Sequence, residues 1–167
     1  YNGDTLGHEV EVPGLDAMPG GQGLYQGSTI LLSGQAGTGK TSIACSLTQA
    51  ACADGVPVLY LSFEESVAEL IRNQRSLGID IGRYLADDDR GPLVMLPIRT
   101  VELGLEEHLM RGMHLVKRHR PALVVLDPVS SLAGRGDEPG AKEIPLRLLH
   151  LIKEEGITVV ATEQLRD

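Results

Sequence analysis

A phosphate-binding loop is the feature that most constrains what this chain folds into. Residues 34–41 read Gly-Gln-Ala-Gly-Thr-Gly-Lys-Thr, which matches the pattern G-x-x-x-x-G-K-T at every fixed position. An apolar run at 29–33 precedes the loop, and a helix-forming run at 42–47 follows it. The motif requires a strand before it and a helix after it, and the sequence offers both. The segment therefore predicts a nucleoside triphosphate site between a strand and a helix.

Each residue type in this loop has a physical role. Glycines let the backbone curl so that successive N–H groups point at phosphate oxygens, and the following helix adds the positive end of its dipole. We expect Lys40 to reach the β- and γ-phosphates of ATP and the Thr41 hydroxyl to coordinate Mg²⁺. The expected nucleotide contacts here are Gly34, Gln35, Ala36, Gly37, Thr38, Gly39, Lys40, Thr41 and Ser42.

Composition excludes several classes of protein. A length of 167 residues fits one domain with a substantial apolar core. No apolar stretch approaches the roughly 18 residues of a membrane span, and no signal peptide is visible, which predicts a cytoplasmic protein. The two cysteines, Cys45 and Cys52, are expected to be reduced core residues. A net charge of -8 argues against a nucleic-acid partner.

Apolar strands alternate with helical patterns along the chain. Near-continuous apolar strands joined by amphipathic helices indicate an α/β fold, with a mostly parallel sheet flanked by helices on both faces. Ser66 is the expected N-cap before Glu69, Pro145 must lie in the first turn of its helix, and 134–140 is predicted to be a loop. The expected strands are 29–33, 58–63, 93–98, 122–127 and 157–162, and the expected helices are 40–54, 66–77, 104–119 and 142–155.

Acidic residues follow two of the predicted strands. Asp127 ends the strand 122–127 in the form of a Walker B element, and its carboxylate would reach the hydration shell of Mg²⁺. Glu64 and Glu65 come directly after the strand 58–63 and repel each other unless a cation or a proton stabilises them. One can polarise the attacking water as general base while the other interacts with Mg²⁺, and we assign Glu64 to the metal. A solvated helix N-terminus, where the dipole favours acids, explains the pair equally well.

The remaining polar groups have simpler explanations. The basic run 117–120 closes a predicted helix, where cations complement the dipole. His108 and His114 have no Cys or His partners at metal-ligand spacing and are expected to be solvated. Residues 162–164 follow the last strand, and they either sense the γ-phosphate or simply begin a loop.

An ordered set of segments extends across nearly the whole chain from about Val12 onward. These segments are 14–21, 23–28, the phosphate loop, 63–66, 71–80, 126–132 and 157–162. Together they resemble the KaiC family, RecA-superfamily ATPases of the cyanobacterial circadian clock with relatives far outside cyanobacteria. The resemblance implies a RecA-like P-loop NTPase core. It also implies ATP bound at the subunit interfaces of a hexameric ring, Mg²⁺ dependence and slow ATP hydrolysis.

The family's functional residues transfer by position. Residues 37–42 would hold the phosphates and the metal, and Glu64 with Glu65 matches the family's catalytic glutamate pair. Ser76 and Leu77 fall where the family approaches the nucleotide base. Residues 1–11 match poorly and are expected to be a lead-in, with 12–167 forming the ATPase domain. The chain begins at Tyr1 and stops before the family's basic Lys-x-Arg-Gly segment and any phosphorylated Ser/Thr pair, so we expect a portion of a longer protein.

Three functions follow from these features. The first is a Mg²⁺-dependent KaiC-type ATPase, a regulator with Ser/Thr autokinase activity and clock-type protein partners. The second is a RecA/RadA-type recombinase that assembles on DNA, and the third is a non-catalytic ATP-binding scaffold. The acidic net charge, one Phe, four Tyr and no Trp weigh against the recombinase, as does the double glutamate. We therefore expect the KaiC-type ATPase, with no nucleic-acid or membrane partner.

Overall fold

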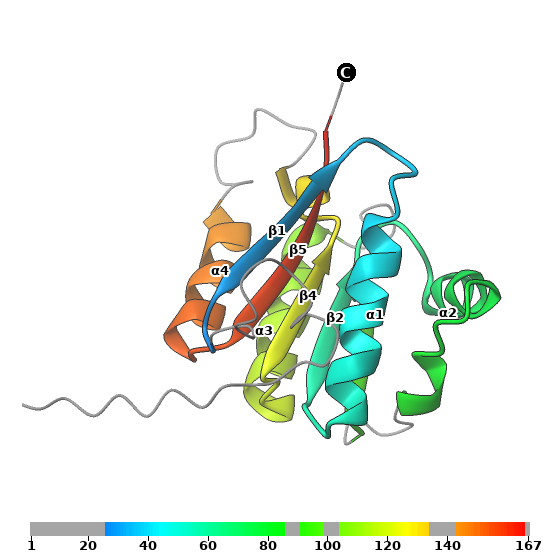
Figure 1. Ribbon diagram of the computed structural model, residues 1–167. Coiled ribbons are helices and arrows are strands. Elements are labelled where there is room, and N and C mark those ends of the chain that lie inside the picture. The colour runs from blue at the N-terminus through cyan, green and yellow to red at the C-terminus, as the bar shows by residue number, and fades with distance from the viewer. Residues whose placement is uncertain (1–25, 86–90, 99–103, 134–142, 166–167) are drawn as a thin grey trace, which may run out of the picture.

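Five parallel strands form one sheet in the part of the chain that the computed structural model describes, residues 26–85, 91–98, 104–133 and 143–165 (Figure 1). Their order across the sheet is β1-β5-β4-β2-β3. The strands are β1 (Thr29–Gly34), β2 (Val58–Ser62), β3 (Leu93–Pro97), β4 (Leu123–Asp127) and β5 (Thr158–Gln164). Every predicted strand is confirmed, and β5 ends two residues later than predicted because Gln164 still pairs with Gly34 of β1.

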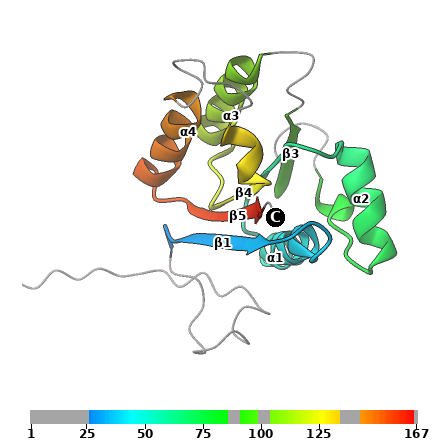
Figure 2. The same cartoon turned by 90° about the horizontal axis from the view of Figure 1, so that it is seen from above.

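Helices cover both faces of this sheet, as the sequence predicts. Figure 2 shows α1 on one face and α3 with α4 on the other. The helices are α1 (Lys40–Ala53), α2 (Val67–Ser76), α3 (Leu105–His119) and α4 (Glu143–Glu154), with short 3-10 turns η1 (Gly82–Tyr84) and η2 (Val129–Ala133). Crossovers between parallel strands are right-handed. The moves from β1 to β2 to β3 therefore place α1 and α2 on one face, and the return through β4 to β5 places α3 and α4 on the other.

The two faces bury separate apolar clusters. On β2, Val58 and Tyr60 pack toward α1, whereas Leu59 and Leu61 pack toward α3 and α4. Every residue of β2 and β4 is buried, which explains why these strands are continuous apolar runs instead of alternating ones. Complete burial of one leucine side chain contributes about 1.5–3 kcal/mol to folding. The central strands therefore supply the rigid frame on which the polar residues at their ends are held.

Local helix signals act as the sequence predicts. Ser66 caps α2 in a capping box: its Oγ accepts from the Glu69 N–H at 3.3 Å, and Glu69 Oε2 accepts from the Ser66 N–H at 3.0 Å. The helix α4 begins at Glu143, which places Pro145 in its first turn. The predicted loop 134–140 lies outside the described residues. None of the described helices is long and apolar enough to cross a membrane.

The polar residues of α3 agree with the sequence predictions, except for one histidine near the start of the helix. Lys117, Arg118 and His119 occupy its last turn, where positive charge complements the helix dipole. His114 is exposed, as expected. The prediction of a solvated side chain is wrong for His108, because its Nε2 is buried and has no hydrogen-bond partner among the described residues.

Two adjacent residues of α3 test the packing of this helix on the sheet. Leu109 is 0% exposed in the core, whereas Met110 is 58% exposed. We expect Leu109→Ala to lower the free energy of unfolding by about 2–5 kcal/mol, because it leaves a cavity. The matched control Met110→Ala should change it by less than about 0.5 kcal/mol. Denaturant unfolding measures both values, and equal losses would contradict this placement of α3.

Candidate functional site

The phosphate loop joins the end of β1 to the start of α1, at the side of the sheet formed by the carboxyl ends of the parallel strands (Figure 1). Gly37 and Gly39 have φ of 78° and 83°, a left-handed conformation that side chains with a Cβ rarely adopt. At Gly34 a Cβ would come 2.7 Å from Thr38 Oγ1, so the exposed Thr38 side chain would have to move to make room for it. Residues 35–39 are exposed, and no side chain caps the first N–H groups of α1. The loop therefore offers backbone donors to an anion.

The Lys40 ammonium folds back over this loop. Its Nζ donates to the backbone oxygens of Gly34 at 2.8 Å and Gln35 at 2.5 Å, and to Thr38 Oγ1 at 3.2 Å. Thr38 Oγ1 in turn donates to the Gln35 oxygen at 2.9 Å. Neutral oxygens hold the cation at the loop, and negatively charged phosphate oxygens are stronger acceptors for the same donors.

Asp127 is the polar centre of the site. Its carboxylate lies at the end of β4 and is only 7% exposed. Oδ1 accepts from Thr41 Oγ1 at 3.3 Å and from Thr162 Oγ1 at 2.5 Å, and Oδ2 accepts from the Tyr60 hydroxyl at 2.6 Å. The donors come from α1, β5 and β2. The structure thus brings together Thr41 and Asp127, which are 86 residues apart in the sequence.

These groups fit a magnesium ion that is shared with a nucleotide. No cluster of three or more His, Cys, Asp or Glu side chains suited to a metal occurs among the described residues. Mg²⁺ does not need such a cluster, because it keeps several waters and binds through one or two carboxylates plus substrate phosphates. Asp127 and Thr41 offer the hard oxygen ligands it prefers. The salt bridges among the described residues, Arg75 with Asp80 and His150 with Glu154, do not involve Asp127.

Tyr60 and Cys45 extend the contacts of Asp127 into the core. Burial raises the pKa of the Tyr60 hydroxyl well above 10.0, so the phenol stays protonated and acts as a donor. Burial also raises the pKa of the Cys45 thiol to about 12, and its Sγ donates to the Tyr60 oxygen at 3.7 Å. No sequence motif singles out Tyr60. A tyrosine within an aliphatic strand is a usable signal, because a buried hydroxyl needs a partner.

Glu64 and Glu65 follow β2 and have different partners. Glu64 is exposed, and its Oε1 accepts from Ser131 Oγ in η2 at 3.5 Å. Glu65 is partly buried, and its Oε1 accepts from the Asn73 amide of α2 at 3.0 Å. Both glutamates precede α2, which begins at Val67 after its own cap. The two adjacent carboxylates therefore accept hydrogen bonds from separate elements, η2 and α2.

Residues at the end of β5 form hydrogen bonds with both β1 and η2. Glu163 Oε2 accepts from Ser33 Oγ at 3.0 Å, and the Gln164 N–H donates to Ser130 Oγ at 3.4 Å. Together with the bond from Thr162 to Asp127, these contacts show that residues 162–164 continue a strand instead of beginning a loop. Whether they sense a γ-phosphate stays a prediction.

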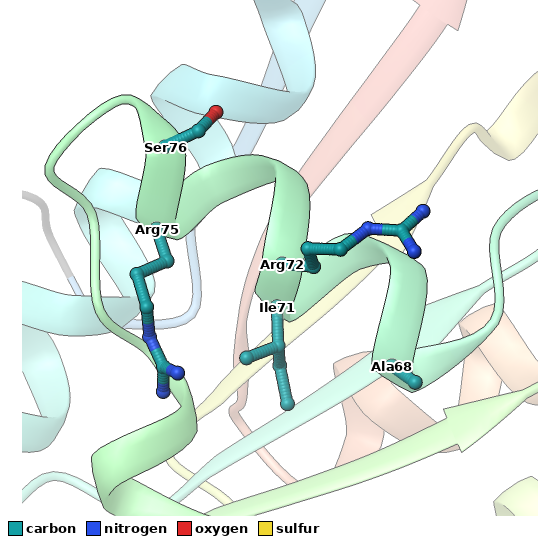
Figure 3. A pocket seen from close by; sticks show the side chains of 5 residues that line it. All are labelled: Ala68, Ile71, Arg72, Arg75 and Ser76. Atoms are coloured by element: carbon teal, nitrogen blue, oxygen red, sulfur yellow. The ribbon is translucent and has the colours of Figure 1, made fainter.

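Ser76 is the last residue of α2, and Leu77 is the C-cap residue that follows it. The phosphate loop belongs to a different part of the chain, between β1 and α1. Ser76 lines an open surface hollow of about 540 Å³, together with Ala68, Ile71, Arg72 and Arg75 (Figure 3). Its Oγ donates to the Asn73 oxygen at 2.6 Å, and Leu77 is 64% exposed. All the lining residues belong to α2, and none belongs to the phosphate loop. The base contact expected of Ser76 and Leu77 stays a prediction.

Comparison with known proteins identifies close likeness to one family. The family model described as the KaiC ATPase matches residues 9–167. The circadian clock protein KaiC2 of Synechocystis sp. is 41% identical over 152 residues, which cover 91% of this chain and 26% of that protein. The circadian clock oscillator proteins KaiC of Parathermosynechococcus lividus and Acaryochloris marina are 33% and 32% identical, each over 86% of this chain. The chain spans about a quarter of the length of these relatives.

The buried thiol of Cys45 predicts a loss of stability in alkali. Its folded-state pKa of about 12 lies above the ordinary value of 9.0. From pH 9 upward the unfolded state releases a proton that the folded state still binds, so the free energy of unfolding falls as pH rises. The slope for this thiol is at most about 1.4 kcal/mol per pH unit. We expect denaturant unfolding between pH 9 and pH 11 to show a shallower loss in Cys45→Ala than in the wild type. Parallel curves would contradict the assignment.

Proposed function

Because this chain belongs to the KaiC family of ATPases, we propose that it is the Mg²⁺-dependent, ATP-hydrolysing domain of a KaiC-like regulator. One observation carries this proposal: Thr41, the last residue of the phosphate loop and part of the first turn of α1, lies 3.3 Å from the buried Asp127 carboxylate. The contact joins the phosphate-binding and metal-binding halves of a nucleotide site. Membership of an ATPase family implies ATP as the nucleotide.

ATP binding would use the loop and Lys40. The Lys40 ammonium already lies at the loop on neutral acceptors, and a triphosphate would offer it charged oxygens at small rearrangement cost. Backbone N–H groups of 37–42 and the dipole of α1 would bind the remaining phosphate oxygens. Gln35, Ala36 and Thr38 form the exposed rim of this cradle.

Thr41 and Asp127 are the residues that would hold Mg²⁺, which would supply positive charge to neutralise the charge that develops on the phosphates. Thr41 would hold the ion by its hydroxyl, and Asp127 would hold a water of the ion's hydration shell. Glu64 contacts η2, the turn that directly follows the Asp127 strand, and this position supports its assignment to the metal side. Glu65, fixed by Asn73, would then polarise the attacking water.

Further parts of the proposal follow the family resemblance. They are ATP at the subunit interfaces of a hexameric ring, a base contact at Ser76 and Leu77, clock-type protein partners and Ser/Thr autokinase activity in the whole protein. The two buried free cysteines suit a reducing cytoplasm. The recombinase alternative is disfavoured because the net charge of -8 opposes binding to DNA phosphates. It would require helical filaments on DNA instead of closed rings.

Removal of the loop lysine tests nucleotide binding. We expect Lys40→Ala to weaken ATP·Mg²⁺ binding by about 10²-fold or more, because it deletes the cation facing the β- and γ-phosphates. Isothermal titration calorimetry of the full-length protein measures this, and sizing with and without ATP should show that nucleotide-dependent assembly is lost. Lys117→Ala, in the exposed last turn of α3, is the matched control and should bind normally. If the folded Lys40→Ala variant binds ATP·Mg²⁺ with near-wild-type affinity, the proposed nucleotide site is wrong.

The glutamate pair separates an enzyme from a binding scaffold. Changing Glu64 and Glu65 together to Gln keeps size and hydrogen bonding but removes the base. ATP turnover should fall by roughly 10²-fold or more while ATP still binds. Glu106 and Glu107, another adjacent pair of acids in the first turn of α3, provide the matched double Gln control. If phosphate release from the Glu64/Glu65 variant stays within about twofold of wild type, the scaffold function replaces the enzyme.

A further inference from the structure

The side chain of Tyr60 places its hydroxyl group inside an apolar core. The side chain is 0% exposed and is the largest among the fully buried residues. It stands on β2 in the cluster that packs against α1, with Val58 on the same strand face. A phenylalanine would fill the same volume without burying a hydroxyl, and burying an unbonded hydroxyl is costly. Packing therefore does not explain why this position carries an oxygen.

The Tyr60 hydroxyl is fully engaged with the candidate metal site. It donates to Asp127 Oδ2 at 2.6 Å and accepts from Cys45 Sγ at 3.7 Å. The Cys45 thiol donates to the lone pair of the Tyr60 oxygen, so the single hydroxyl proton of Tyr60 is left to point at Asp127. The hydroxyl contacts the site through one atom only, Oδ2, and leaves Oδ1 to Thr41 and Thr162.

This division of the two oxygens fixes the orientation of the carboxylate. A change in the side-chain rotamer of Asp127 would move its carboxylate oxygens away from Thr41. The Tyr60 donor resists that rotation, because β2 is paired on both sides: Tyr60 is in register with Met95 of β3 and Val125 of β4. A rigid ring on a central strand is a more precise anchor than a side chain on a loop.

We propose that Tyr60 is a positioning residue of the metal site, which holds Asp127 with Oδ1 beside Thr41 and so lowers the Mg²⁺ concentration that nucleotide binding requires. This inference rests on the proposed function, since it assigns the metal to Asp127 and Thr41. Tyr60 is fully buried and would act on the metal only through its hydrogen bond to Asp127. Its effect must therefore appear in the Mg²⁺ requirement and must pass through Asp127.

The test compares Tyr60→Phe with the wild type in the full-length protein. A fluorescent ATP analogue is bound first without Mg²⁺ and then during a Mg²⁺ titration, and thermal unfolding without nucleotide is measured in parallel. We expect Tyr60→Phe to raise the half-saturating Mg²⁺ concentration by about tenfold, the scale of one hydrogen bond to a charged group. Binding of the analogue without Mg²⁺ should stay within about twofold. Tyr84→Phe, a half-buried tyrosine at the edge of the same core, should leave both values unchanged.

A double-mutant cycle with Asp127→Asn tests the route of the effect. In that background, adding Tyr60→Phe should shift the Mg²⁺ requirement by less than about twofold, since the group being positioned is already altered. A full tenfold shift there would show that Tyr60 acts through packing, and would overturn the inference. An unchanged Mg²⁺ requirement in Tyr60→Phe alone, with or without a lower melting temperature, would overturn it as well.

Failure of the proposed function is distinguishable from failure of this inference. If the wild type and Lys40→Ala bind the analogue equally, or if wild-type binding ignores Mg²⁺, the proposed function fails and the inference falls with it. If the wild type needs both Lys40 and Mg²⁺ while Tyr60→Phe matches Tyr84→Phe, only the role of Tyr60 is lost.

Discussion

The burial of the Asp127 carboxylate among hydroxyl groups is the interaction on which the site depends. Thr41, Tyr60 and Thr162 satisfy its oxygens without supplying a positive charge. Transferring an ionised carboxylate into the protein interior is costly, and neutral donors offset only part of that cost. A carboxylate held only by neutral hydroxyl donors can still act as a hard oxygen ligand of a divalent cation, and the adjacent loop supplies the place for the phosphates that would share it.

This arrangement requires the observed strand order. β4 lies between β5 and β2, so Thr162 and Tyr60 reach Asp127 from its two neighbouring strands, and α1 brings Thr41 across the face. β5 also separates the phosphate-loop strand from the Asp127 strand. A slip of one residue in β2 would turn Tyr60 to the other face of the sheet, because successive side chains alternate. Packing of the two apolar clusters and geometry of the polar site are therefore set together.

Local signals made much of the fold predictable. The phosphate loop, the capping box at Ser66 and Glu69, and the position of Pro145 each depend on neighbours in sequence. The strand runs were readable because strands buried on both faces are continuously apolar. The ends of strands were less predictable: β5 extends to Gln164 through its pairing with β1, and that partner is 130 residues away in the chain.

The sequence by itself determined the phosphate loop, the acids that follow β2 and end β4, the α/β class and the family, because these follow from residue types at fixed local spacing. Only the tertiary structure decided which side chains meet. It joined Thr41 to Asp127, separated Glu64 from Glu65 by giving them partners on η2 and α2, and placed the Tyr60 hydroxyl on Asp127. The physical reason is strand order and register, which bring distant residues within hydrogen-bonding distance and leave no mark on local sequence.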